Sequence, residues 1–181
     1  CRTAVTDANG IYIFDLPARR PGYTHLGSFR HAYHSQLRVS DEIVLQRGVA
    51  GRLPGVHLNE HGSKQAQALS ARLAKTPIKA IYSSPLERAM ETAQALAATL
   101  NLPVIPHDGL LEVDFGDWQD QSLKALRRLK IWKVVQGSPS QMRFPNGESF
   151  AEAQLRIVQA LEEFRLQHDP KDLFVCVSHG D

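Results

Sequence analysis

The segment Leu173 to Val177 constrains the fold most, because it is an unbroken apolar run that is too short for a helix. It is rich in β-branched and aromatic residues, as is typical of strands buried on both faces of a helix-covered parallel sheet. Ser178, His179 and Gly180 follow it at once. Open α/β sheets bind ligands at the carboxyl ends of their strands. His179 is therefore either a site residue or an ordinary turn histidine.

From residue 49 onward, short strands alternate with amphipathic helices. Two helices begin with the capping-box pattern S-x-x-E, at Ser84 and at Ser149, and Pro85 is expected at the first helical position of the former. This alternation predicts a parallel or mostly parallel sheet with helices on its faces. The expected helices cover 59–75, 84–100, 122–135 and a segment that begins at 149, and the expected strands cover 78–82, 102–105 and 173–177.

The composition is that of an ordinary globular domain, with 43% hydrophobic and 22% charged residues. The net charge of +2 argues against a bulk nucleic-acid or membrane-surface binder and leaves a local basic pocket open. Two cysteines exclude a disulfide framework and favour a reducing cytoplasm. No apolar stretch approaches the roughly 18 residues of a membrane span.

Residues 1–47 do not share this order. They contain six arginines and no lysine, whereas all seven lysines come later. Their strand candidates are Ile11 to Phe14 and the poorer Leu26 to Phe29. Two interpretations remain open: a divergent N-terminus, or a segment that is partly outside the intended reading frame.

Four side chains with suitable chemistry follow predicted strand ends. Arg30 and His31 follow Phe29, Arg88 follows Tyr82 on the first helical turn, and His179 follows Val177. In a parallel sheet all of them open onto one edge. Arginine forks and a helix N-terminus bind phosphate oxygens, and a neutral imidazole can attack phosphorus. Such a cluster is sufficient for phosphoryl transfer without a metal.

Phosphoryl transfer also needs an acid to protonate the leaving oxygen. Glu112, in the context GLLEVDFGDW, is the best candidate, because apolar neighbours favour a protonated carboxyl group. A different reading comes from His57, Glu60 and His61, which spell H-x-x-E-H, an inverted zinc-protease motif. Zinc is disfavoured there, because Gly62 follows at once and Pro54-Gly55 lies just upstream.

The chain resembles the histidine phosphatase superfamily, in its phosphoglycerate mutase-like group. The matching stretches are RHA at 30–32, AGRLPGVHLNEHG at 50–62, YSSPLERAMETA at 82–93, LLEVDFGDW at 110–118, FPNGES at 144–149 and VSHGD at 177–181. The resemblance implies a three-layer α/β/α sandwich and one histidine phosphatase domain over 1–181, with the close match over 49–181. It also implies a chain that is truncated at its C-terminal end, because family members continue past S-H-G-D.

The resemblance further implies the role of each site residue. His31 would be the nucleophile, in the family's R-H-G position, and Glu112 the proton donor and then the base. Arg30, Arg88, His179 and Gly51 would bind the phosphoryl group together with His31. The departures are Ala32 in place of glycine, Leu37 in place of a frequent asparagine, and Trp118-Gln119-Asp120 in place of W-E-G.

We therefore expect a metal-independent phosphomonoester hydrolase that forms a phosphohistidine, uses no cofactor and acts on a small phosphorylated substrate in the cytoplasm. Neither nucleic acid nor membrane is an expected partner. One alternative is mutase-type phosphoryl transfer, which the short segment 117–147 disfavours. Another is an inactive fragment or a phosphate-binding pseudoenzyme. The substrate and the oligomeric state do not follow from the sequence.

Overall fold

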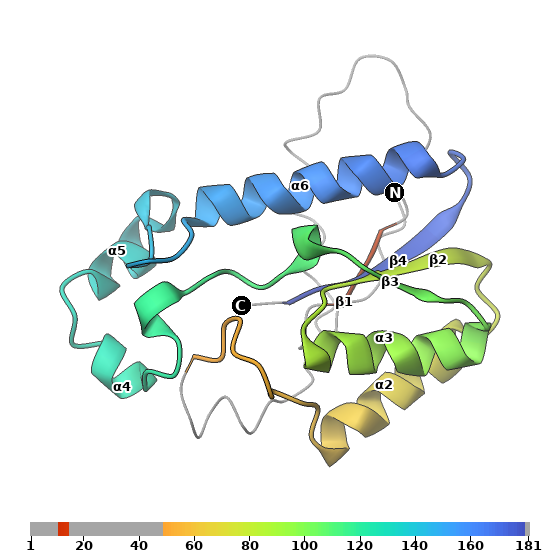
Figure 1. The fold of residues 1–181 in the computed structure, drawn as a ribbon, viewed down its shortest axis with the longest axis horizontal. Helices are drawn as coiled ribbons and strands as arrows, with labels where there is room; N and C mark the ends of the chain where they lie inside the picture. Colours follow the sequence, from red (N-terminus) through yellow and green to blue (C-terminus); the bar gives the residue numbers. More distant parts are fainter. Residues whose placement is uncertain (1–10, 15–48, 180–181) are drawn as a thin grey trace.

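The computed structural model describes residues 11–14 and 49–179, and it contains a four-stranded sheet between two layers of helices (Figure 1). The strands are β1 (Ile11–Phe14), β2 (Ile78–Ser83), β3 (Val104–Pro106) and β4 (Leu173–Val177), in the spatial order β1-β4-β2-β3. Strand β2 pairs in parallel with both β3 and β4, whereas β1 pairs antiparallel with β4. The predicted mostly parallel α/β fold is confirmed.

Because β1 is antiparallel to β4, it does not end at the same edge of the sheet as the parallel strands. Ile11 lies opposite Val177 and Phe14 lies opposite Phe174, so the start of β1, not its end, lies beside the carboxyl end of β4. The second strand candidate, Leu26 to Phe29, lies outside the described residues, as do Arg30 and His31.

Three long helices form the outer layers. Helices α2 (Glu60–Leu73) and α3 (Glu87–Leu100) cover one face of the sheet, and α6 (Phe150–Gln167) covers the other (Figure 1). Strand β4 serves both layers: Val175 and Val177 pack in the core under α2 and α3, while Phe174 and Cys176 pack under α6. Burying such a side chain contributes roughly 1.5–3 kcal/mol. The three-layer sandwich and the doubly buried terminal strand are confirmed.

Of the two predicted capping boxes, one forms. Asn59 caps α2 by accepting a hydrogen bond from the Gly62 amide, and Ser149 forms a complete capping box with Glu152 at the start of α6. The predicted capping box at Ser84 is wrong. Helix α3 begins at Glu87, and its N-cap residue, Leu86, makes no side-chain cap. The Ser84 amide instead donates to the Val177 carbonyl, so Ser84 belongs to the sheet edge.

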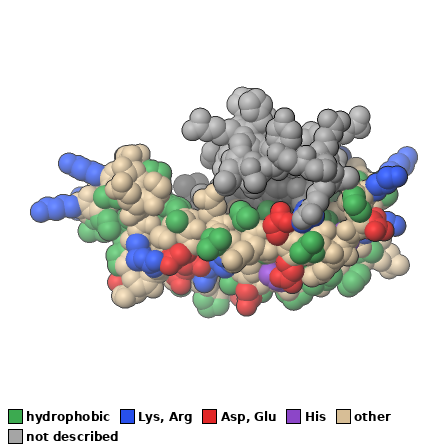
Figure 2. All heavy atoms as spheres, turned by 90° about the horizontal axis from the view of Figure 1, so that it is seen from above, with side chains coloured by type: hydrophobic (Ala, Val, Ile, Leu, Met, Phe, Trp, Pro, Cys, Tyr) green, Lys and Arg blue, Asp and Glu red, His purple; other side chains and the backbone are tan. Residues whose placement is uncertain are grey.

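A separate lobe connects β3 to α6, and it differs from the prediction of one helix over 122–135. Two short helices form instead, α4 (Leu123–Leu126) and α5 (Trp132–Gly137). The break lets Leu126 and Trp132 join one core around Trp118, whose ring stacks on Trp132 with centroids 5.7 Å apart. Basic side chains project from this end of the molecule (Figure 2), where the exposed ones are Lys124, Arg127, Arg128, Lys130 and Lys133.

Three 3₁₀ turns complete the described fold: η2 (Asp108–Leu110), η3 (Gly116–Trp118) and η4 (Pro139–Gln141). Among the helices of the described ranges, none has the length and apolar character needed to cross a membrane.

Candidate active site

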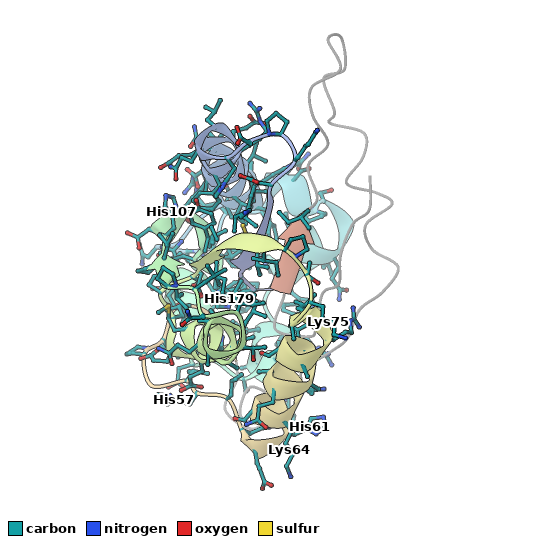
Figure 3. All side chains as sticks on the ribbon, turned by 90° about the vertical axis from the view of Figure 1, so that its right-hand side faces the viewer. His57, His61, Lys64, Lys75, His107 and His179 are labelled. Atoms are coloured by element: carbon teal, nitrogen blue, oxygen red, sulfur yellow. The ribbon has the colours of Figure 1, made fainter. Side chains whose placement is uncertain are left out.

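The carboxyl ends of β2 and β4 lie side by side and bring the first two site residues together. Ser83 pairs with Val177, and the Ser84 amide donates to the Val177 carbonyl over 2.8 Å. This register places His179 beside Ser84, and His179 Nε2 lies 2.7 Å from Ser84 Oγ. In Figure 3, His179 lies inside the molecule, close to α3. The predicted convergence of these two strand ends is therefore observed.

Arg88, on the first turn of α3, is a buried arginine with an incomplete set of partners. Its Nη2 donates to the Gly51 carbonyl over 3.0 Å, while Nη1 is buried without a hydrogen-bond partner among the residues that the structure describes. A buried donor without an acceptor costs about 1–3 kcal/mol, and more when it is charged. An anionic oxygen beside Nη1 would remove this cost.

Gly51 orients Arg88, and its backbone conformation favours glycine. Its φ of +51° lies in the left-handed region, and a Cβ atom there would come within 2.5 Å of Gln119 Oε1. The carbonyl group of Gly51 helps to orient the guanidinium of Arg88 by accepting the hydrogen bond from Nη2.

Glu112 is the buried carboxyl group next to His179. Its Oε1 accepts a hydrogen bond from the Val113 amide over 2.7 Å, and its Oε2 lies 4.0 Å from His179 Nδ1. The side chains of His179 and Glu112 are only 4% and 6% exposed. Because Oε1 is already an acceptor, a proton on this carboxyl group is best carried by Oε2, on the side of the histidine.

The electrostatic field of the site keeps His179 neutral. Burial, and then the positive charges of Arg88, Arg156 and Arg52, hold the pKa of His179 well below its ordinary value of 6.5. Arg52 and Arg156 are paired with Glu148, whereas Arg88 has no carboxylate partner among the described residues and keeps its positive charge available. Such a site suits an anion whose own charge adds to the hydrogen bonds that it accepts.

Two of these arginines, Arg52 and Arg156, were not singled out by the sequence reasoning. Both donate to the carbonyl group of Glu112, and both form ion pairs with Glu148. One signal for Arg156 was present in the sequence. It lies three residues after Ala153 and four before Ala160, on the buried stripe of α6, where an unpaired charge is rare.

The structure thus brings together four of the predicted site residues: Gly51, Arg88, Glu112 and His179. Arg30 and His31 lie outside the described residues.

The zinc motif has no support in the described part of the chain. His57 Nδ1 lies 2.5 Å from Glu91 Oε1, and no group of three or more His, Cys, Asp or Glu within 11–14 and 49–179 is arranged to hold a metal ion. Figure 3 shows His57 and His61 well away from His179.

Comparison with known proteins shows the family to which the chain belongs. The family model of the histidine phosphatase superfamily (branch 1) matches residues 39–181. Phosphoserine phosphatase 1 of Hydrogenobacter thermophilus is 34% identical over 137 residues, which cover 71% of this chain and 63% of that protein. The metal-independent phosphoserine phosphatase of Arabidopsis thaliana is 36% identical over 154 residues, or 77% of this chain and 64% of that protein.

Solved structures agree with these matches. Mycobacterial hydrolase 1 superposes with a TM-score of 0.69 at 25% identity and covers 77% of this chain and 70% of its own. Mycobacterial glucosyl-3-phosphoglycerate phosphatase in complex with inorganic phosphate superposes with a TM-score of 0.67 at 26% identity, over 73% of this chain and 67% of its own. The chain spans just under two thirds of the length of the two phosphoserine phosphatases.

Proposed function

Because the chain belongs to the histidine phosphatase superfamily, we propose that it hydrolyses small phosphate monoesters through a covalent phosphohistidine on His31. The observation that carries this proposal is the buried, unpartnered Nη1 of Arg88 at the same sheet edge as a neutral His179 and a buried Glu112. These are the groups that the proposed reaction needs: an arginine nitrogen open to an anion, a neutral imidazole and a buried carboxyl group.

Arg88 and His179 receive the phosphoryl group in this proposal, together with Arg30. Arg88 offers Nη1 to one phosphoryl oxygen, while Nη2 stays on the Gly51 carbonyl and fixes the plane of the guanidinium. The N-terminal amides of α3 add further positive potential at the same place. The arginine side chains thereby stabilise the negative charge of the transferred phosphoryl group.

Glu112 moves the proton in both halves of the reaction. A ring nitrogen of His31 attacks phosphorus, the bond from phosphorus to the ester oxygen breaks, and Glu112 Oε2 gives its proton to that oxygen. The resulting carboxylate then takes a proton from water as the water oxygen attacks phosphorus and the bond from phosphorus to the His31 nitrogen breaks. Inorganic phosphate leaves, and His31 and Glu112 return to their starting states.

The relatives support the choice of substrate class without identifying a substrate. Two of them are named as phosphoserine phosphatases, and a structural neighbour is a glucosyl-3-phosphoglycerate phosphatase in complex with inorganic phosphate. We assign the substrate of this chain to the same broad class, small phosphorylated metabolites.

The cytoplasm is the proposed compartment, in keeping with the free, buried thiol of Cys176, whose pKa is raised by burial.

The test is a rapid-quench experiment with p-nitrophenyl phosphate and phosphoserine as substrates. We expect release of inorganic phosphate and a phosphohistidine that mass spectrometry locates at His31. His31→Ala should abolish both, and His57→Ala serves as the matched control, because His57 is an exposed histidine paired with Glu91.

Each other outcome rejects a defined part of the proposal. Labelling of a different residue would reject His31 as the nucleophile. Transfer of the phosphoryl group to a second hydroxyl group, in place of water, would identify a mutase. Phosphate binding without label or turnover would identify a pseudoenzyme.

A further inference from the structure

Every backbone carbonyl from Asp108 to Glu112 accepts a hydrogen bond from a side chain. Ser178 Oγ donates to Leu110 over 2.8 Å, and Arg156 donates to the other four carbonyls, joined at Glu112 by Arg52 Nε over 2.8 Å. Its Nη1 donates to the carbonyls of Asp108, Gly109 and Leu111 over 3.3, 3.0 and 2.9 Å, and its Nη2 reaches that of Glu112 over 3.4 Å.

These carbonyls end a 3₁₀ turn, so they have few partners of their own. The turn η2 stops at Leu110, and the chain then runs extended past Leu111 to Glu112. A planar guanidinium with five N–H donors can join several such carbonyls at once, whereas a lysine ammonium is a point charge on a flexible stem. The geometry of Arg156 therefore depends on its being arginine.

Glu148 holds the other side of the same guanidinium. It accepts from Arg156 Nε over 3.1 Å and from Nη2 over 3.0 Å, it pairs with Arg52 over 2.7 Å, and it accepts from the Asp114 amide over 3.2 Å. Partial burial acts to raise the pKa of Glu148, but the hydrogen bonds from Arg156 and the Asp114 amide hold it below its ordinary value. The backbone is thus anchored both before and after Glu112.

We infer that Arg156 is the positioning residue of the proton donor: it fixes the backbone of 108–112 so that Glu112 Oε2 faces the phosphoryl site. This rests on the role of Glu112 in the proposed function. The carboxyl group itself has its Oε1 on the neighbouring Val113 amide, so its position follows the backbone. A displacement of about 1 Å can lower the rate on the order of a hundredfold.

The first test compares two substrates that differ in how much their leaving group needs protonation. Departure of the p-nitrophenolate of p-nitrophenyl phosphate needs little protonation, whereas departure of the serine alkoxide of phosphoserine needs the acid. For Arg156→Lys we expect kcat/KM to fall about a hundredfold with phosphoserine and only a few-fold with p-nitrophenyl phosphate. Glu112→Gln should reproduce this pattern. Arg165→Lys is the matched control, because Arg165 lies on the same helix and pairs with Glu162. Equal losses with both substrates would overturn the inference.

The second test does not depend on activity. Hydrogen exchange followed by mass spectrometry should show faster exchange of peptides covering 108–114 in Arg156→Lys, with β2 and β4 unchanged. If Arg156→Lys does not fold, Glu148→Gln removes the charge that holds the guanidinium and should give the same local loss of protection, to a smaller degree.

Unchanged exchange in 108–114 would overturn the inference. A wild-type chain that is inactive on both substrates would reject the proposed function, and the exchange result would then show by itself whether Arg156 holds this segment.

Discussion

The N-terminal ends of α3 and α6 differ in what they leave unpaired. Helix α6 begins with a complete capping box, and its Arg156 donates to four carbonyls and to Glu148. Helix α3 begins without a side-chain cap, and its Arg88 has one buried nitrogen without a partner among the described residues. The satisfied end stabilises the fold, while the unsatisfied end lies at the sheet edge beside His179. The buried Arg88 Nη1 without a partner among the described residues thus lies where an anion would bind.

The largest effect that would test this contrast is on catalysis at Arg88. Arg88→Lys keeps a positive charge and the helix but loses the planar fork, so we expect kcat/KM for phosphoserine to fall about 10²–10³-fold. The midpoint of urea unfolding should change little. Steady-state kinetics and urea unfolding, with Arg165→Lys alongside, check this. Near-normal activity would remove Arg88 from the site.

A smaller effect, on stability, is expected at Arg156. Arg156→Ala leaves the carbonyls of Gly109 and Leu111 without their side-chain donor and removes one of the donors to Glu148, so the free energy of unfolding should fall by about 2 kcal/mol. Arg88→Ala removes a nitrogen that lacks a partner and should destabilise the fold less. Urea unfolding of both variants under the same conditions decides the order. A larger loss of stability in Arg88→Ala than in Arg156→Ala would contradict the proposed difference between the two helices.

The pH dependence of stability should follow the same contrast. The pKa of His179 is lowered in the folded state, so below pH 6.5 the unfolded chain binds a proton that the folded chain does not. Stability should therefore fall with decreasing pH in this window, by up to about 1.4 kcal/mol per pH unit. His179→Gln should flatten this slope in urea unfolding measured from pH 5 to 8.

His57 supplies the control of opposite sign. Its hydrogen bond to Glu91 raises its pKa above 6.5, so its stabilising contribution is present at low pH and is lost as the pH rises through the folded-state value. His57→Gln should leave the His179-dependent slope in place.

Vanadate, as an anion, should raise the pKa of His179, and NMR titration of the imidazole can measure this shift. An unshifted pKa with vanadate bound would place the anion elsewhere.

The smallest effect is expected at the cap of α6. Ser149→Ala should lower the free energy of unfolding by about 1 kcal/mol, because Ser149 Oγ accepts from the Glu152 amide. The hydrogen bonds from Arg143 and Ser149 lower the pKa of Glu152 to about 2, so the contribution of this cap should fade as the pH drops below 4.5. Ser84→Ala is the comparison: it should alter the titration of His179 without loosening a cap.

Local patterns predicted the elements that carry their own signals. The strand Leu173 to Val177 was predicted with its observed bounds, and the cap at Ser149 formed as its spacing indicates. The pattern at Ser84 has the same spacing but made no cap, because the sheet register engages its amide with Val177 and places His179 on its hydroxyl oxygen. The same S-x-x-E spacing therefore caps a helix at Ser149 but not at Ser84, where the neighbouring strand β4 engages the backbone amide.

Periodicity and motif spacing are properties of neighbours along the chain, so they predicted the order of strands and helices, the doubly buried terminal strand and the residue types of the site. Three features did not follow from such local patterns: the antiparallel direction of β1, the division of the helix predicted over 122–135, and the placement of Arg156 across the carbonyls of 108–112. Each of these depends on contacts between segments distant in sequence, where packing and the pairing of buried polar groups outweigh local propensity.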